Sequence, residues 1–130
     1  MKLLYLPLLI ILYLVPASFA DPIDNVANLI RQSNIRELSK LFAPGIEITI
    51  QGEGGVYSTA QAEVVVDKFF SENKPVAVKV LHKVNSNPGF QLGVLILTTI
   101  KGTFRIAYTL KGAEGNLKLI VMRIESDKVK

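Results

Sequence analysis

Apolar residues recur at helical spacing in three stretches of the first half of the chain. The first two stretches follow the capping residues Asp21 and Asn34, and the second is predicted to end at Pro44–Gly45. The third begins at the capping box Ser58-Thr59-Ala60-Gln61 and runs to about Glu72. The apolar stripes comprise Ile23, Val26, Ala27 and Ile30; Ile35, Leu38, Leu41 and Phe42; and Ala62, Val65, Val66, Phe69 and Phe70.

Alternating apolar and polar residues predict strands in the rest of the chain. Residues 46–51 form one such strand, and residues 52–55 are predicted to be a loop. Four longer strands are predicted at roughly 76–84, 90–100, 103–111 and 117–125. The short, turn-rich connections between these four imply an antiparallel meander. The sequence therefore predicts an α+β fold, with the three helices on one face of an antiparallel sheet.

The first twenty residues have the pattern of an export signal. Lys2 precedes an apolar run from Leu3 to Val15, and Ser18-Phe19-Ala20 places small residues at the −3 and −1 positions of a cleavage site. The run is shorter than the ~20 residues that a membrane-spanning helix needs. We expect cleavage after Ala20 and export to the periplasm or outside the cell, as a single domain of residues 21–130 without membrane attachment. An uncleaved membrane anchor is the alternative.

Composition excludes several classes of site. The 130 residues suit one domain, and the absence of cysteine excludes disulfides, thiolate metal sites and cysteine nucleophiles. A single histidine argues against a histidine-based metal cage, so we expect neither a metal nor a cofactor. The net charge is +4, but the basic residues are scattered among acidic ones along the chain. This distribution argues against a nucleic-acid partner.

Several short segments resemble a known protein family. They are Leu41-Phe42-Ala43-Pro44, the strand from Ile46 to Ile50, the segment from Gly55 to Glu63, Phe69-Phe70, Leu81-His82, Gly102-Thr103-Phe104-Arg105 and Arg123-Ile124-Glu125. Together they resemble small exported proteins of unknown function in the nuclear-transport-factor-2-like superfamily. The resemblance implies a cone-like, curved sheet around a pocket. It implies no particular activity, because the superfamily contains both enzymes and non-enzymes.

Candidate ligand-binding residues come from the predicted strands and from one helix start. His82 is in phase with the apolar positions of its strand, so it is either a general base in a pocket or a core residue, and we favour the second. Arg105 and Arg123 either clamp an anion inside the cone or form ion pairs with Glu125 or Glu47.

Two tyrosines complete the set of candidates. Tyr57 precedes the Ser58 cap, where it packs against the helix or lines the mouth of a pocket. Tyr108 lies on the strand face opposite Arg105 and is a candidate lining residue. His82 is the one weak catalytic candidate.

These features favour a non-catalytic binding domain whose cone pocket holds a small or anionic ligand. One alternative is a small enzyme that uses His82. Another is an assembly subunit, because Leu92, Val94 and Ile96 on one face and Leu95 and Leu97 on the other make a strand apolar on both sides. Since the helices cover only one face, we expect a homodimer through the other.

Overall fold

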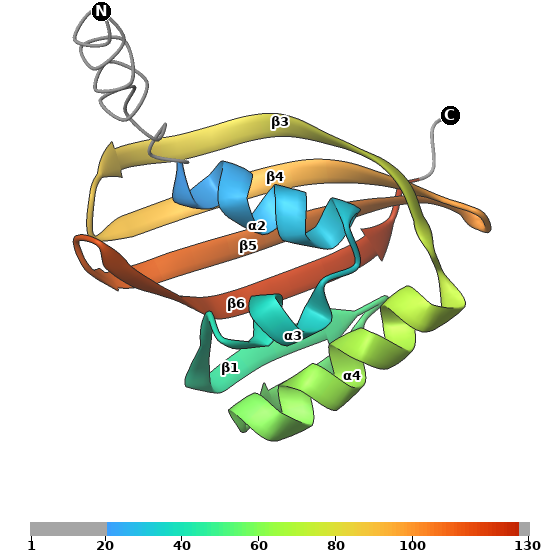
Figure 1. The fold of residues 1–130 in the computed structure, drawn as a ribbon, viewed down its shortest axis with the longest axis horizontal. Helices are drawn as coiled ribbons and strands as arrows, with labels where there is room; N and C mark the ends of the chain where they lie inside the picture. The colour runs from blue at the N-terminus through green and yellow to red at the C-terminus, as the bar shows by residue number, and fades with distance from the viewer. Residues whose placement is uncertain (1–20, 128–130) are drawn as a thin grey trace, which may run out of the picture.

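A computed structural model describes residues 21–127, in which three helices pack on one face of a six-stranded sheet (Figure 1). The helices are α2 (Pro22–Arg31), α3 (Ile35–Ser39) and α4 (Thr59–Glu72). The strands are β1 (Phe42–Ile50), β2 (Glu53–Tyr57), β3 (Pro75–Asn87), β4 (Phe90–Thr99), β5 (Gly102–Ala113) and β6 (Asn116–Ser126). The predicted export signal at 1–20 and the last three residues of the predicted domain lie outside the described residues.

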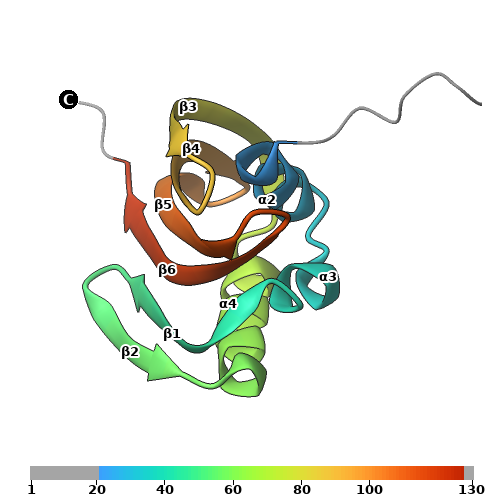
Figure 2. The ribbon, with the colours of Figure 1, turned by 90° about the vertical axis from the view of Figure 1, so that its left-hand side faces the viewer.

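The strand order across the sheet is β2-β1-β6-β5-β4-β3. The meander from β3 to β6 is antiparallel, as predicted, but β1 lies parallel to β6, so the sheet is mixed. The sheet curls around α2, with β3 above it and β6 below it (Figure 2). The α+β class, the curved sheet and the three helices on one face are therefore confirmed.

The first two strands depart from the prediction. The second helix ends at Ser39, and Phe42 already belongs to β1 rather than to the helix. The predicted loop at 52–55 is wrong, because Glu53–Tyr57 pairs with β1 as a strand. Gln51 and Gly52 alone form the turn, with φ angles of 51° and 86°. Positive φ at both central residues is the requirement of a two-residue type I′ hairpin turn, so the hairpin closes without a longer loop.

The helix starts follow the predicted capping pattern. The Asp21 side chain accepts a hydrogen bond from the Ile23 backbone N–H at 2.8 Å and begins α2. Ser58 and Gln61 form the reciprocal capping box of α4. Lys83 Nζ on β3 lies 2.6 Å from Asp24 Oδ2 and so ties the start of α2 to the sheet; this hydrogen bond raises the pKa of Lys83.

The apolar stripes of the helices meet the sheet in one core. The residues without measurable exposure come from all three helices and from β1, β4, β5 and β6: Ile23, Val26, Ile30, Leu38, Ile46, Ile48, Ala62, Val66, Leu95, Leu97, Ile106, Tyr108, Leu119, Met122 and Ile124. Within residues 21–127, no helix is long and apolar enough to cross a membrane.

Candidate functional site: the open face of the sheet

The side of the sheet that faces the helices is filled by side chains. Tyr108 is fully buried there, and its hydroxyl donates a hydrogen bond to the Ile23 carbonyl oxygen at 2.8 Å. A Cβ added at Gly93 would lie 2.7 Å from an Ile23 methyl carbon and 2.8 Å from the Tyr108 ring. Because α2 packs this closely on β4 and β5, Tyr108 is a core residue rather than the wall of a central pocket.

A pocket lies at the end of the cone where α2 begins. This pocket has a volume of about 380 Å³ and is lined by Pro22, Asn25, Leu41, Leu110, Gly115 and Leu117. None of the five predicted ligand-binding residues lines it. Gln91, which pairs with Leu110 across the sheet, is 8% exposed, and its Oε1 has no hydrogen-bond partner among the described residues.

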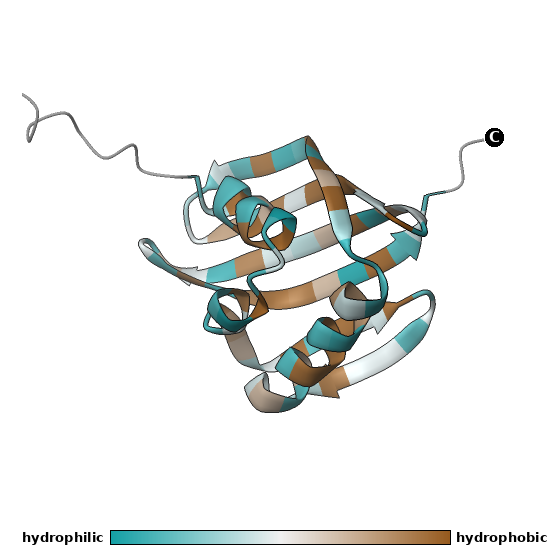
Figure 3. Ribbon diagram, turned by 45° about the vertical axis from the view of Figure 1, so that its right-hand side comes forward, coloured by the Kyte–Doolittle hydropathy of each residue, from teal (hydrophilic) through white to brown (hydrophobic). Residues whose placement is uncertain are grey.

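The face turned away from the helices, here called the open face, carries an apolar surface that none of residues 21–127 covers. On β4 the side chains alternate, so that Leu95 and Leu97 enter the core while Leu92, Val94 and Ile96 are half-buried on the open face. The register places Thr109 and Ala107 of β5 and Val121 of β6 in the same rows. Phe90 and Val84 extend the surface and are 46% and 52% exposed. Figure 3 shows, by the hydropathy of each residue, that apolar positions recur along the strands of the sheet.

His82 lies on this open face, which corrects the prediction that it shares a face with Val78 and Val80. The pairing of β3 with β4 shifts between Val80 and His82, so that one extra residue, Leu81, interrupts the alternation. His82 therefore pairs with Val94 and is exposed. Within residues 21–127, no hydrogen bond or ion pair joins its imidazole to another side chain.

A second irregularity changes the setting of Arg123. Simple alternation along the strand predicts that Arg123 shares a face with Leu117, Leu119 and Val121, but the pairing of β5 with β6 shifts at Ile120, so it shares a face with Val121 alone. Leu119 is consequently in the core, whereas Arg123 lies on the open face opposite Ala107. This bulge, like the one in β3, moves a polar side chain out of a row of apolar ones.

Both arginines of the predicted anion clamp have acidic neighbours. Arg123 Nη2 is 3.0 Å from Glu125 Oε1, and Arg105 Nη2 is 3.5 Å from Asp127 Oδ1. The arginine side chains are 59% and 51% exposed, respectively, so these are surface ion pairs at the end of the sheet.

The fifth candidate, Tyr57, is far from this group in the sheet. It ends β2, on the helix side, and borders a groove between the β1–β2 hairpin and α4. The structure thus brings His82, Arg105 and Arg123 onto one face and separates Tyr57 and Tyr108 from them. The apolar neighbours Phe90, Val84 and Val121 were not among the predicted site residues.

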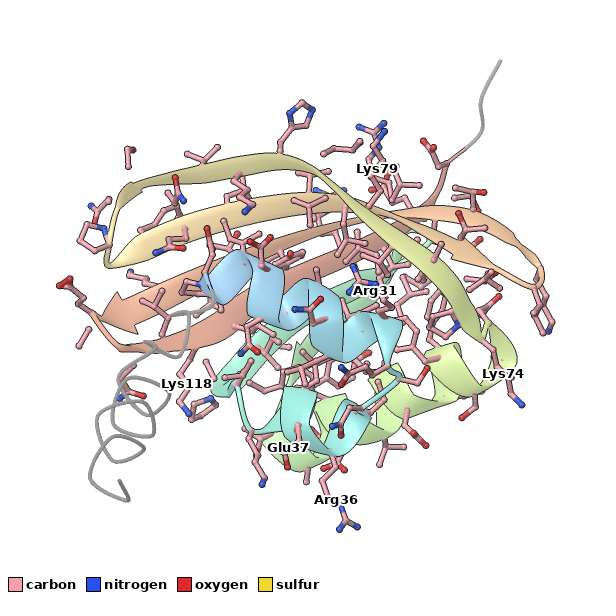
Figure 4. The ribbon with its side chains drawn as sticks, turned by 45° about the horizontal axis from the view of Figure 1, so that its top comes forward. Arg31, Arg36, Glu37, Lys74, Lys79 and Lys118 are labelled. Atoms are coloured by element: carbon pink, nitrogen blue, oxygen red, sulfur yellow. The ribbon has the colours of Figure 1, made fainter. Side chains whose placement is uncertain are left out.

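Three basic side chains of the helix side do not form a cluster. Arg36, Lys74 and Lys118 lie at separate edges of the molecule (Figure 4). In the part of the chain that the structure describes, no group of three or more histidine, cysteine or acidic side chains is placed to hold a metal ion. The candidate functional site is therefore the open face, with its apolar rows and its charged margin.

Comparisons with known proteins agree with this fold. Residues 23–125 match the model of DUF4783, a domain of unknown function. A DUF4783 family protein from Bacteroides uniformis superposes with a TM-score of 0.77 at 21% identity, over 84% of this chain and 100% of that one. One from Bacteroides ovatus gives 0.74 at 22% identity, over 88% and 97% of the two chains.

A more distant structure agrees with the resemblance found in the sequence. An NTF2-like (nuclear-transport-factor-2-like) protein from Cytophaga hutchinsonii superposes with a TM-score of 0.56 at 14% identity, over 77% of this chain and 88% of that one. No curated protein matches the chain.

Proposed function

The chain belongs to the DUF4783 family of domains of unknown function, and we propose that it is an exported, non-catalytic interaction domain that binds a second copy of itself through the open face of its sheet. The proposal rests on the row Leu92, Val94 and Ile96 on β4, the strand next to the edge strand β3, which no described residue covers. Apolar side chains in such a row gain free energy when a second surface removes them from water.

The size of the apolar surface supports a protein partner. It extends over three strand spacings from Val84 on β3 to Val121 on β6, and over six residue steps from Phe90 to Ile96 along β4. With about 4.8 Å between strands and about 3.4 Å per residue, the patch measures roughly 14 Å by 20 Å. That is roughly 300 Å², whereas a standard interface buries about 800 Å² per partner. A stable contact therefore has to include the charged margin.

The charges of that margin favour a copy of the same chain. Lys79, Arg105 and Arg123 lie on the open face with Glu125, and Glu47 of the neighbouring strand β1 lies at the end of another of its rows. One surface thus presents both signs of charge beside an apolar centre. A two-fold symmetric contact requires such a self-complementary patch, because the same surface of both copies takes part. A basic residue of one copy that meets an acidic residue of the other therefore forms the same pair a second time.

The surroundings of His82 support a non-catalytic role. General acid–base catalysis requires a proton-transferring group held within hydrogen-bond reach of the substrate. His82 is exposed on the outer surface of the curved sheet, and the interior beside it is filled by Tyr108 and α2. Ion pairing to Glu125 and Asp127 gives Arg123 and Arg105 a structural role without an anionic ligand.

The export part of the proposal is supported by the leader alone. Lys2, the apolar run and the small residues before Asp21 match a cleavable signal. Intact-mass measurement of the protein recovered from the cell envelope or the medium tests it. The mass of a protein that begins at Asp21 supports export with cleavage, and the mass of a protein that retains Met1 contradicts it.

Sedimentation velocity at micromolar protein tests the interface. In the Val94→Lys variant a charge stands in the centre of the patch, where its desolvation opposes association. We expect the unchanged protein to sediment as a dimer and Val94→Lys as a folded monomer. Val64→Lys is the matched control, because Val64 is 68% exposed on α4, away from the sheet; this variant should remain dimeric. A monomeric unchanged protein, or a dimeric Val94→Lys, would falsify the proposal.

A further inference from the structure

The strand β2 forms one edge of the sheet, and the described residues leave its outer side without a neighbouring strand (Figure 2). The two-residue turn Gln51–Gly52 makes Ile50 and Glu53 a pair that exchanges both backbone hydrogen bonds. The pairing then alternates, so Gly54 and Val56 direct their backbone N–H and C=O groups away from β1. These groups form a free edge that an extended chain can pair with.

The opposite edge of the sheet, β3, is protected in ways that β2 is not. Its pairing shifts at three points, and it carries Lys79 and Lys83. Bulges and lysines are features by which proteins prevent a strand from joining an edge. The pairing of β2 with β1 is regular over all five of its residues, and the strand contains neither lysine nor proline.

A groove runs beside this free edge on the helix side. Its volume is about 440 Å³, and its apolar wall comes from Ile50, Tyr57, Val65 and Phe69. Gly54 is part of its lining, and Gly55, between Glu53 and Tyr57 on the same side of β2, places no side chain beside it. A Cβ added at Gly55 would have no atom within 4 Å.

The geometry points to a binding site for an extended peptide segment of another protein, which we propose adds to β2 as a further strand. A residue of that peptide opposite Gly55 occupies a non-hydrogen-bonded pair, in which the two Cα atoms are only ~4.5 Å apart. Its side chain lies directly over the glycine and enters the groove against Val65 and Phe69. An aromatic side chain fills such a gap best, because it is large enough to occupy the space beside Gly55, which has no side chain, and to bury a large apolar area there.

Charge specifies a second position of the peptide. Glu53 and Glu72 border the groove, with Lys68 as its one basic group, and the ion pairs of the described residues include none of the three. Lys68 and Glu72 are four residues apart on α4, so their opposite charges compensate each other. Glu53 is left to pair with a basic residue opposite it. In an antiparallel arrangement the peptide motif is therefore aromatic-x-Lys or aromatic-x-Arg.

The test uses a synthetic peptide, acetyl-Thr-Thr-Phe-Thr-Lys-Thr-Thr-amide, titrated into isotope-labelled protein and followed by amide NMR shifts. We expect shifts in β2 and on the groove side of α4, with a Kd below ~1 mM. Replacing the phenylalanine of the peptide by serine should weaken binding at least about tenfold.

Three protein variants test the groove, the opposite side of the strand and the charge of Glu53 separately. Gly55→Val fills the open space without a clash and suits a strand, so the protein stays folded while peptide binding weakens at least about tenfold. Val56→Thr changes the opposite side of the same strand and should leave the affinity nearly unchanged. Glu53→Lys should reverse the preference toward a peptide with glutamate in place of lysine.

The inference is overturned by any of four results. These are an absence of shifts at millimolar peptide, equal affinity of the serine peptide, unimpaired binding to Gly55→Val, or shifts at β3 or the open face instead of β2. Self-association that depends on β2 would equally overturn it, since a second copy would then occupy the edge. Repeating the titration in Val94→Lys keeps this outcome separate from that of the proposed dimer.

Discussion

At the scale of single residues, Tyr108 fills the interior of the cone in the part of the chain that the structure describes. Its ring packs between β5 and α2, and its hydroxyl reaches the Ile23 carbonyl oxygen. Burial raises the pKa of Tyr108 above its ordinary value, with smaller contributions from the carboxylates of Asp24 and Asp21. A tyrosine held neutral in this way serves the core rather than proton transfer.

Removing that hydroxyl should destabilise the domain without changing its fold. Tyr108→Phe keeps the ring but deletes the hydrogen bond, which typically contributes about 1 kcal/mol to the free energy of unfolding. Urea unfolding followed by circular dichroism measures the loss. Tyr57→Phe is the control, because no hydrogen bond of the Tyr57 hydroxyl occurs among the described residues. Equal stabilities of Tyr108→Phe and the unchanged protein would contradict the role given to this bond.

The raised pKa of Tyr108 predicts that the free energy of unfolding depends on pH. Unfolded tyrosine ionises near pH ~10, whereas folded Tyr108 holds its proton to higher pH. The unfolded state therefore binds fewer protons above pH ~10, and the free energy of unfolding falls as the pH rises further. Urea titrations between neutral and alkaline pH should show a shallower decline in Tyr108→Phe. A decline of the same slope in both proteins would contradict this linkage.

The sequence placed some of these residues correctly and others not. Alternation along 103–111 put Tyr108 opposite Arg105, and the structure agrees. The same reasoning failed for His82 and Arg123, because a bulge reverses the alternation before each of them. A bulge depends on how two strands pair, so a single strand's pattern does not reveal it.

At the scale of secondary-structure elements, the capping signals were the most informative part of the sequence. The box at Ser58 and Gln61 was predicted and is present, and α4 ends at Glu72 as expected. The strand β2 was missed because Gly54 and Gly55 have low strand propensity. Its pairing rests on the turn at Gln51–Gly52, whose positive φ at a non-glycine residue has no clear signal in the sequence.

The cap of α4 gives a prediction at this scale. Ser58→Ala removes the acceptor for the Gln61 backbone N–H at the start of the helix. We expect a loss of about 1 kcal/mol in the free energy of unfolding, measured by urea denaturation. Ser71→Ala, an exposed change near the other end of α4, should leave it nearly unchanged. Equal effects of the two substitutions would argue that the box contributes nothing specific.

At the scale of the whole molecule, one sheet has two unlike faces. The helices, Tyr108 and the apolar stripes close one face, and the row Leu92, Val94 and Ile96 remains open on the other. The sequence predicted this two-sided character, since apolar residues fill both phases of β4. It did not predict that β1 would extend the sheet beside β6, because that contact joins strands far apart in the chain.

Binding of a second copy through the open face is best measured as contacts between two differently labelled protein samples. In a mixture of one isotope-labelled and one unlabelled preparation, isotope-filtered NMR detects only contacts between copies. We expect intermolecular contacts from the methyl groups of Leu92, Val94 and Ile96, and none from the exposed Val64 on α4. Absence of intermolecular contacts at the open face, or their appearance at α4 instead, would contradict the account.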